Sequence, residues 1–537
     1  MKQFSIFTIV IAFFSILIIF MAERTDILNV NAERVEPSFS EKNGQLTFSW
    51  RPFKYPCYYR VDTLSRTTGL VPGEPKYHLF SSEFTHESSY KTPPAAIPVY
   101  YRVSAYGLFG RLTDPSEPIP NPNFRTPPMP VIVSNYDEKN PASLMPFLLW
   151  HTVPNAVCYE VELLSGLPDS EGGIELSKSN HLMSTRQVYS NGWQADLRPY
   201  RNLTRIYWRV RALGLHHETI GEFSQTQEIF VDAHAPMPDR PIITSYDSMN
   251  QSSQPLYPVY EWIPLNGIRR YEVELMTHPP AVENDTAPTP DRAWYKIVDG
   301  ITSCYDEYAR PYAGPYYWRV RAVDENGNGI GTWSTSEKFV VTSHDHVTTA
   351  IFGDSISHGG GAVSYAPSSF EYSYGMYLDF PTWNLSRSGD TSTTTLERFD
   401  TDVLPCQPKN LIVLTGTNSL RTTMITHDDV IRDIQAIKTR CEENNIRPIF
   451  LTLMPINPEN IEYVFQVPTD PDWHEKLDKI NAFIRELPYH IDIEPYFYDK
   501  TRSVLDYNLS VDGLHPDIQG KMLMAEIINL HKNMFLK

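Results

Sequence analysis

The chain of 537 residues has little cysteine and a deficit of basic side chains. Its five cysteines and 16 histidines show no spacing that matches a zinc site, so we predict neither a metal nor a cofactor. Lysine and arginine together number 46 against 64 aspartates and glutamates, which gives a net charge of −18. Such a chain repels phosphate backbones, and we therefore predict no nucleic-acid partner. The length predicts several domains.

One long apolar run occupies residues 4–22, and it lacks a convincing small-x-small cleavage site. Lys2 precedes the run and Glu23 follows it, while its length lies between a signal-peptide core and a membrane span. No cysteine follows directly, which excludes a bacterial lipoprotein. We expect residues 1–22 to be an uncleaved signal anchor. Residues 4–22 would then lie in the membrane, and the rest of the chain would lie outside the cytoplasm. A cleaved signal peptide, giving a secreted protein, is the alternative.

A pattern of aromatic strands occurs three times in the first two thirds of the chain. In each occurrence, a strand that ends at a tryptophan is followed later by an aromatic-Arg-Val strand. The tryptophan strands are Leu46–Trp50, Pro146–Trp150 and Pro258–Trp262, and the later strands are Tyr100–Val103, Tyr207–Arg211 and Tyr317–Arg321. Alternating short strands in units of about 100 residues predict all-β sandwiches. We place these modules at 36–126, 127–236 and 237–344, and they resemble fibronectin type III modules. A spacer role is expected, and a glycan-binding aromatic face is the alternative.

The remaining segment alternates apolar strands with helical patterns. Ala350 to Phe352 reads as a buried strand that stops at Gly353, and Ser355 lies just past its end. Ligands of open α/β sheets bind outside the carboxyl ends of the strands. Strands and helices in alternation predict a doubly wound parallel sheet with helices on both faces, with strands at 348–352, 410–415 and 448–453 and helices near 427–444, 473–486 and 517–532.

Four polar blocks follow one another in this segment, and together they resemble the SGNH (GDSL) family of serine hydrolases over residues 346–537. The blocks are Gly353–Ser355, Asn384–Asp390, Leu411–Asn418 and Asp512–Pro516. The resemblance implies a three-layer α/β/α domain. It also implies that Ser355 is the nucleophile and that His515 is its general base. A neutral hydroxyl is a weak nucleophile, so a base must take its proton. Asp512 would hold the imidazole in the required tautomer.

The resemblance further implies an oxyanion hole. Its donors would be the backbone N–H groups of Ser355 and Gly389 and the side-chain amide of Asn418. We expect glycine at 389 because the backbone there must approach the substrate closely. Ser419 follows Asn418 where many relatives have aspartate, so the shape of the pocket can differ from theirs.

Two cysteines of this segment could form a disulfide. Cys406 precedes one predicted strand and Cys441 ends the helix before the next, so both would lie at the edge of the sheet away from Ser355. A bridge is compatible with an exported domain. The alternative is a buried thiol, since Cys441 continues the apolar face of Ile434 and Ile437.

We expect an exported serine esterase that hydrolyses acyl esters, most simply acetyl esters on an extracellular carbohydrate, through an acyl-serine intermediate. Relatives of this kind cleave glycan acetates, lipid esters and thioesters, and export with three β modules suits an extracellular polymer. Nearby aromatic side chains could stack on sugar rings, and ordinary packing is the alternative for them; they are Tyr365, Phe370, Tyr372 and Tyr374. The alternatives are an O-acyltransferase of exopolysaccharide assembly, a lipase or thioesterase, and an inactive adhesion or scaffold protein.

Overall fold

The computed structural model describes most of the chain beyond residue 34. The described residues are 35–42, 45–53, 58–67, 76–92, 100–107, 110–111, 115–116, 118–120, 129–170, 175–243, 255–290, 292–310, 315–340, 347–361, 363, 372–499, 501, 503–534 and 536. The predicted signal segment 1–22 and Cys57 lie outside them. Among the described residues, no helix combines the length and the apolar character that a membrane span requires.

The chain divides into two compact units, of which the first comprises residues 1–67 and 76–128. Its strands form two antiparallel sheets, β1 (Ser38–Lys42), β2 (Gln45–Ser49) and β5 (Ser89–Thr92) in one, and β4 (Lys76–Thr85), β3 (Tyr58–Thr67), β6 (Tyr100–Gly107) and β7 (Gly110–Arg111) in the other, with β8 (Ile119–Pro120) on β6. The ring of Trp50 packs edge-on against Tyr59 at 5.1 Å, and both are buried in a shared core with Val103.

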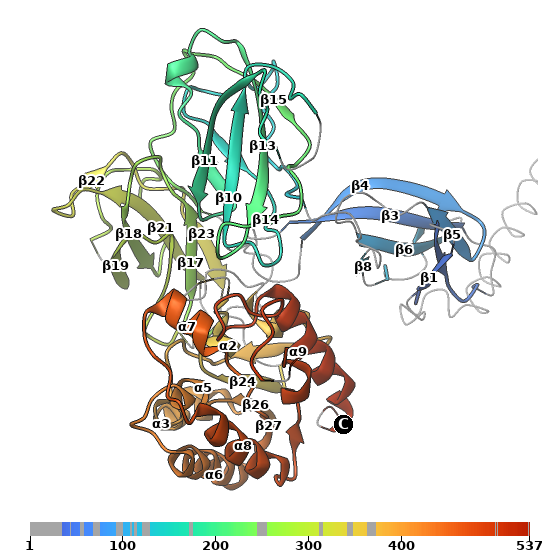
Figure 1. Ribbon diagram of the computed structural model, residues 1–537, viewed down its shortest axis with the longest axis vertical. Helices are drawn as coiled ribbons and strands as arrows, with labels where there is room; N and C mark the ends of the chain where they lie inside the picture. The colour runs from blue at the N-terminus through green and yellow to red at the C-terminus, as the bar shows by residue number, and fades with distance from the viewer. Residues whose placement is uncertain are drawn as a thin grey trace, which may run out of the picture. The chain divides into compact units, whose positions relative to one another are not determined.

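The second unit contains two further pairs of antiparallel sheets (Figure 1). The second β module has β9 (Phe147–Leu149) and β12 (Gly192–Gln194) in one sheet, and β10 (Cys158–Leu164), β11 (His181–Val188), β13 (Arg205–Leu213), β14 (Thr219–Ile220) and β15 (Gln227–Phe230) in the other. The third β module has β16 (Ile242–Ile243), β17 (Val259–Ile263) and β20 (Ser303–Tyr305), and then β18 (Arg270–Met276), β19 (Trp294–Asp299), β21 (Pro315–Val323), β22 (Gly329–Ile330) and β23 (Glu337–Val340).

The repeated tryptophans have the same surroundings in each pair of sheets. Trp150 packs on Tyr159 and Trp262 on Tyr271, as Trp50 does on Tyr59. Each of these tyrosine hydroxyls accepts a backbone N–H from the turn six residues earlier, at 2.8–3.0 Å. The sequence repeat therefore corresponds to a structural repeat, and its assignment as fibronectin type III stays a prediction.

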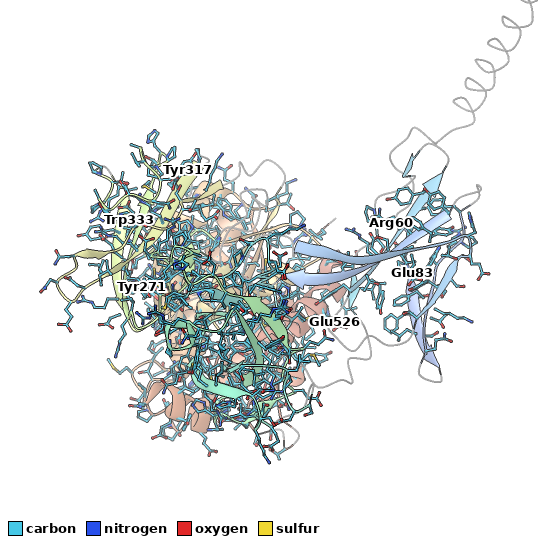
Figure 2. All side chains as sticks on the ribbon, turned by 90° about the horizontal axis from the view of Figure 1, so that it is seen from above. Arg60, Glu83, Tyr271, Tyr317, Trp333 and Glu526 are labelled. Carbon is cyan, nitrogen blue, oxygen red and sulfur yellow. The ribbon has the colours of Figure 1, made fainter. Side chains whose placement is uncertain are left out.

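The Arg-Val-Arg part of the repeat is explained by the pleat of β21. Side chains alternate between the two faces of a strand, so Trp318 and Val320 enter the core while Arg319 lies on the other face. Arg319 is 1% exposed because Trp333 covers it at 4.6 Å, and its guanidinium pairs with Glu274 at 2.8 Å. Figure 2 labels Trp333 on this module. Such a buried charge requires a partner of this kind.

The C-terminal part of the second unit holds a parallel sheet in the order β25-β24-β26-β27-β28. The strands are β24 (Thr349–Gly353), β25 (Thr382–Asn384), β26 (Asn410–Leu414), β27 (Arg447–Leu451) and β28 (His490–Ile491). The three strands predicted from apolar runs are thus confirmed to within two residues. Since β24 lies between β25 and β26, the chain moves to opposite sides of β24, and this is the switch point at which such sheets bind ligands.

Helices cover this sheet in two groups. Helix α6 (His427–Glu443) contacts both α3 (Ser392–Glu397) and α8 (Trp473–Arg485), and α9 (Ile518–Leu530) contacts η3 (Tyr374–Tyr377). Figure 1 shows α9 on one side of the strands and α6 and α8 on the other, which is the predicted layering. The predicted helix near 427–444 begins at a capping box, in which Thr426 accepts the N–H of Asp429.

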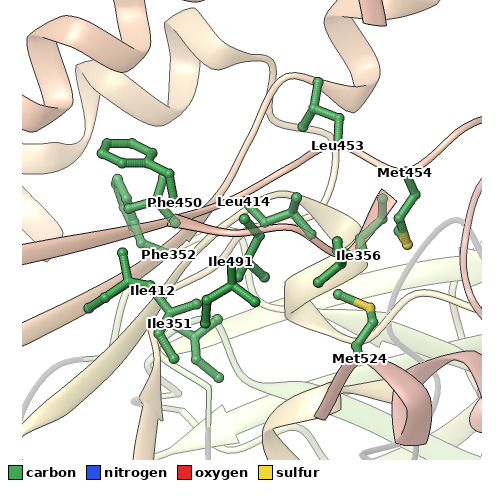
Figure 3. Close-up of a cluster of buried hydrophobic side chains, with 14 of the residues drawn as sticks. Ile351, Phe352, Ile356, Ile412, Leu414, Phe450, Leu453, Met454, Ile491 and Met524 are labelled. Atoms are coloured by element: carbon green, nitrogen blue, oxygen red, sulfur yellow. The ribbon is translucent and has the colours of Figure 1, made fainter. Parts of the chain in front are cut away.

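Apolar side chains of the strands and of the flanking helices meet in one core (Figure 3). Phe352 of β24 and Ile412 of β26 are fully buried in it. Ile356, one residue after Ser355, packs in the same cluster as Met524 of α9. The turn after β24 is therefore fixed by the core on its apolar side.

The considered Cys406–Cys441 disulfide is absent, because both residues are free cysteines. Cys441 is fully buried on the apolar face of α6. The thiol of Cys406 donates instead to the backbone oxygen of Asp402 at 2.9 Å. Burial raises the pKa of Cys441 to about 12 and raises that of Cys406 as well, so neither is a reactive thiolate at neutral pH.

Candidate active site

The turn after β24 presents Ser355 at the carboxyl end of the sheet. A side chain at Gly353 would meet the backbone oxygen of Leu414 at 2.0 Å, so only glycine allows the two strands to approach here. Asp354 then caps the short helix α2 (Ser355–His358) by accepting the N–H of Ile356 at 3.0 Å. Ser355 is the first residue of this helix and is 4% exposed.

Three of the predicted site residues form a continuous chain of hydrogen bonds. The hydroxyl oxygen of Ser355 lies 2.9 Å from Nε2 of His515, and Nδ1 of His515 lies 2.8 Å from Oδ2 of Asp512. Oδ1 of Asp512 accepts the backbone N–H groups of Leu514 and His515 at 2.8 and 2.7 Å. An ionised Asp512 requires a proton on Nδ1, which leaves Nε2 free to accept from Ser355.

Asp512 is fully buried, and burial by itself would raise the pKa of its carboxyl group. The charge of His515 and the hydrogen bonds from that residue and from Leu514 outweigh burial and hold the pKa below the ordinary value. The carboxylate therefore stays ionised at neutral pH, as a partner for an imidazolium must.

The loop that carries Asp512 and His515 is braced by helix α7 (Pro458–Phe465). The N–H of Asn457 donates to the oxygen of Gly513 at 2.8 Å, and the side-chain amide of Asn460 donates to Val511 at 3.1 Å. Gly513 has φ of +78°, and a side chain on it would meet the oxygen of Asn457 at 2.5 Å. Glycine is thus required at this position for two independent reasons.

Two of the three predicted oxyanion donors, Gly389 and Asn418, follow the two strands that flank β24. Gly389 lies in the loop after β25, is exposed and has φ of +88°. Open space surrounds the position of its missing side chain, so among the described residues it is the positive φ that favours glycine there. The expected close approach to the substrate stays a prediction. Asn418 lies in helix α5 (Thr417–Leu420) after β26, and its amide donates to the oxygen of Asp390 at 2.9 Å. The second hydrogen of that amide is left for another acceptor.

Ser419 has a structural contact of its own. Its hydroxyl accepts the N–H of Ser392, the first residue of α3, at 3.2 Å. A small hydroxyl therefore links α5 to α3 at the position where many relatives of the resembled family have aspartate.

The Gly389 loop is supported by a network of charged side chains that sequence reasoning missed, because no motif marks them. Arg387 donates to Oδ1 of Asp390 at 2.6 Å, and Arg398 pairs with the other oxygen of the same carboxylate. Arg398 also donates to the backbone oxygens of Leu385 and Gly353, at 2.6 and 2.8 Å. This one buried guanidinium thus joins the end of β24 to the loop after β25.

Buried ionisable groups also lie behind Ser355. Burial raises the pKa of Asp354 to about 6. Burial lowers the pKa of Lys521 on α9 to about 7, and its ammonium donates to the backbone oxygen of Ile356. Within the described part of the chain, no three His, Cys, Asp or Glu side chains gather as ligands for a metal ion.

Two of the four aromatic residues considered for sugar stacking, Tyr372 and Tyr374, are buried. Tyr374 is fully buried and its hydroxyl lies 3.3 Å from that of Ser357, while Tyr372 is 4% exposed. The stacking role expected of these two is therefore wrong. Tyr365 and Phe370 lie outside the described residues.

Comparison with known proteins adds to this geometry. Residues 351–523 match the GDSL-like lipase/acylhydrolase family. The C-terminal domain is therefore a GDSL/SGNH acylhydrolase domain, a family that implies an ester hydrolase. No curated protein matches the chain.

Three solved structures are each similar to about a third of the chain. A GDSL-like lipase from Bacteroides thetaiotaomicron is 20% identical, with 35% of this chain and 88% of that chain covered and a TM-score of 0.29. The lipase/acylhydrolase from Enterococcus faecalis is 19% identical, with 36% and 97% covered and a TM-score of 0.28. A catalytic mutant of an acetylxylan esterase from Geobacillus stearothermophilus is 15% identical, with 34% and 91% covered and a TM-score of 0.27.

Proposed function

We propose that this protein is an exported serine ester hydrolase that removes acyl groups, and specifically acetyl groups, from an extracellular carbohydrate. The observation that carries the proposal is the hydrogen-bond chain from the Ser355 hydroxyl through His515 to Asp512, inside a GDSL-type domain. The ionised Asp512 supports the proposal, because a carboxylate holds the ring proton on Nδ1 and so directs the lone pair of Nε2 toward Ser355.

In the acylation step, the oxygen of Ser355 attacks the ester carbonyl carbon while its proton moves to Nε2 of His515. The carbonyl oxygen becomes an anion, for which the N–H groups of Ser355 and Gly389 and the amide of Asn418 are the proposed donors. His515 then gives the proton to the departing alcohol oxygen as the carbon–oxygen bond breaks, which leaves an acyl-serine.

Deacylation repeats these steps with water as the nucleophile. His515 takes a proton from the water as its oxygen attacks the acyl carbon, and it returns that proton to the Ser355 oxygen when the acid leaves. If a sugar hydroxyl attacked in place of water, the same intermediate would yield an acyltransferase. We propose an extracellular carbohydrate as the substrate because the chain is predicted to be exported and has three β modules.

The test is hydrolysis of an aryl acetate by the whole chain and by Ser355→Ala, with Ser503→Ala as an exposed serine control. We expect wild-type turnover in the control and loss of turnover to background in Ser355→Ala. A series of aryl esters of increasing acyl length, and then an acetylated oligosaccharide, defines the substrate. Equal activity of wild type and Ser355→Ala would refute the serine mechanism. Turnover that appears only with a sugar acceptor would favour the acyltransferase.

A further inference from the structure

The third β module enters the core of the hydrolase domain. Leu256 and Tyr257 precede β17, yet they are buried in the same apolar cluster as Ile351 and Trp383 of the parallel sheet. The N–H of Leu256 donates to the oxygen of Asn384 at 2.7 Å, at the end of β25. The module therefore docks at the edge strand whose following loop contains Gly389.

A buried histidine connects this segment to that loop. His358 ends the helix that Ser355 begins, and it is 2% exposed. Its Nδ1 accepts the backbone N–H of Ser388 at 3.1 Å, so the ring proton lies on Nε2, which donates to the oxygen of Tyr257 at 2.8 Å. The ring of Tyr305 packs edge-on against the same imidazole at 5.4 Å.

Tyr305 then contacts the peptide unit that includes the proposed oxyanion donor. Its hydroxyl donates to the oxygen of Ser388 at 3.2 Å. That oxygen and the N–H of Gly389 belong to one planar peptide, in which the two groups point in opposite directions. The Tyr305 hydroxyl therefore fixes the direction of the Gly389 N–H from behind. Hydrogen bonding to a peptide oxygen also strengthens the N–H of the same unit as a donor.

The position of Tyr305 is itself well determined. It closes strand β20, where it pairs with Val259 of β17. The next residue, Asp306, is fully buried and accepts from Arg310 at 2.7 Å. Burial raises the pKa of Tyr305, so the hydroxyl retains its proton at neutral pH. A strand of the third β module thus holds the Tyr305 hydroxyl, which donates to the oxygen of Ser388.

We propose that Tyr305 of the third β module is a positioning residue of the esterase, which orients the Gly389 N–H toward the developing oxyanion through the oxygen of Ser388. This inference rests on the proposed function. It makes the third β module part of the catalytic apparatus as well as a spacer, because Tyr305 holds the oxygen of Ser388 directly and Tyr257 holds His358, which accepts the N–H of Ser388.

The test is Tyr305→Phe in the whole chain, which keeps the ring packing and removes only the hydroxyl. Tyr308→Phe is the matched control, since Tyr308 lies three residues on and is 65% exposed. We expect kcat for an aryl acetate to fall about tenfold, which is less than the roughly 100- to 1000-fold loss typical of a deleted oxyanion donor, with KM nearly unchanged. Phenylboronic acid, which forms a tetrahedral adduct with a serine oxygen, should bind weaker by the same factor.

Ser355→Ala in the same assay separates the two proposals. If Ser355→Ala keeps the wild-type rate, the proposed function fails. If it is inactive while Tyr305→Phe matches wild type in kcat and in boronate affinity, the positioning role fails and the esterase stands. Two other outcomes would also overturn the inference, because they would assign the Tyr305 hydroxyl to stability. In one, Tyr308→Phe loses as much kcat as Tyr305→Phe. In the other, the unfolding midpoint of Tyr305→Phe falls together with its kcat.

Discussion

Replacement of Asp512 by asparagine tests the proposed chain of proton transfers most directly, because the structure determines how the new amide must lie. Oδ1 of Asp512 accepts two backbone N–H groups, from Leu514 and His515. The hydroxyl of Ser510 donates to the same oxygen at 3.2 Å. An asparagine must place its oxygen there, since the opposite orientation would leave two buried donors unsatisfied at a cost of about 1–3 kcal/mol each.

With its oxygen fixed in this way, the asparagine presents its NH₂ group to Nδ1 of His515. Nδ1 must then accept, and the ring proton moves to Nε2, which faces Ser355. A protonated Nε2 cannot take the proton of the hydroxyl. Wrong-tautomer substitutions of this kind lower kcat by roughly 10⁴-fold.

The same geometry limits the effect on stability. Asp512→Asn keeps an acceptor for both backbone groups and loses only the charge, so the free energy of unfolding should fall by no more than about 3 kcal/mol. The assay is aryl acetate hydrolysis beside urea unfolding, with Asp506→Asn as the control. Asp506 caps the N–H of Asn508 in the same loop and should be replaceable without loss of activity. A variant at 512 that retains more than about a tenth of wild-type kcat would refute the tautomer argument.

Three further substitutions have expected outcomes of their own. Burial lowers the pKa of His358 to about 3, whereas its value in the unfolded chain is about 6.5. As the pH falls from about 6.5 toward 3, only the unfolded chain gains a proton, so the folded state loses stability. Between pH 7.5 and 5, wild type should therefore lose about 2 kcal/mol more unfolding free energy than His358→Gln in urea unfolding, and equal losses would contradict this. Gly513→Ala should lower kcat about 100-fold, because the new side chain meets Asn457 and shifts the loop. The control is Gly267→Ala, where φ is +75° and the surroundings are open. It should cost only about 1–2 kcal/mol of stability and leave kcat intact. Asn418→Ala should lower kcat roughly 100- to 1000-fold with KM nearly unchanged in steady-state kinetics, and a change confined to KM would remove Asn418 from the oxyanion hole.

The regular elements of the C-terminal domain could be predicted because their signals are local. Ala350 to Phe352 form a fully apolar run that ends at a glycine, and such a run forms a buried strand in any packed sheet. Thr426 marks the start of α6 through contacts within four residues. The proximity of Ser355, Asp512 and His515 followed from the family resemblance, because nothing local in the sequence brings residues 160 positions apart together.

The alternatives that only the structure decides concern side chains whose direction depends on tertiary packing. Cys406 and Cys441 each have a suitable place in the chain order, yet one thiol bonds to the backbone and the other enters the core. Tyr372 and Tyr374 are candidates for a sugar face on residue type alone. Tyr374 instead packs inside the domain, where its hydroxyl meets Ser357. Residue type and order along the chain do not determine which side of a loop faces solvent.

The family resemblance predicts a catalytic domain that begins at residue 346. The structure shows why that boundary is incomplete for function. Tyr257 lies ahead of the third module's first long strand, but its ring is buried with Phe352 and its hydroxyl donates to Asp402 at 2.7 Å. Asp402 in turn pairs with Arg398, which holds the backbone oxygen of Gly353 two residues before Ser355. A chain cut at residue 346 would leave Asp402 without this donor and Ser388 without Tyr305, so the third β module and the hydrolase domain act as one structural unit around the Gly389 loop.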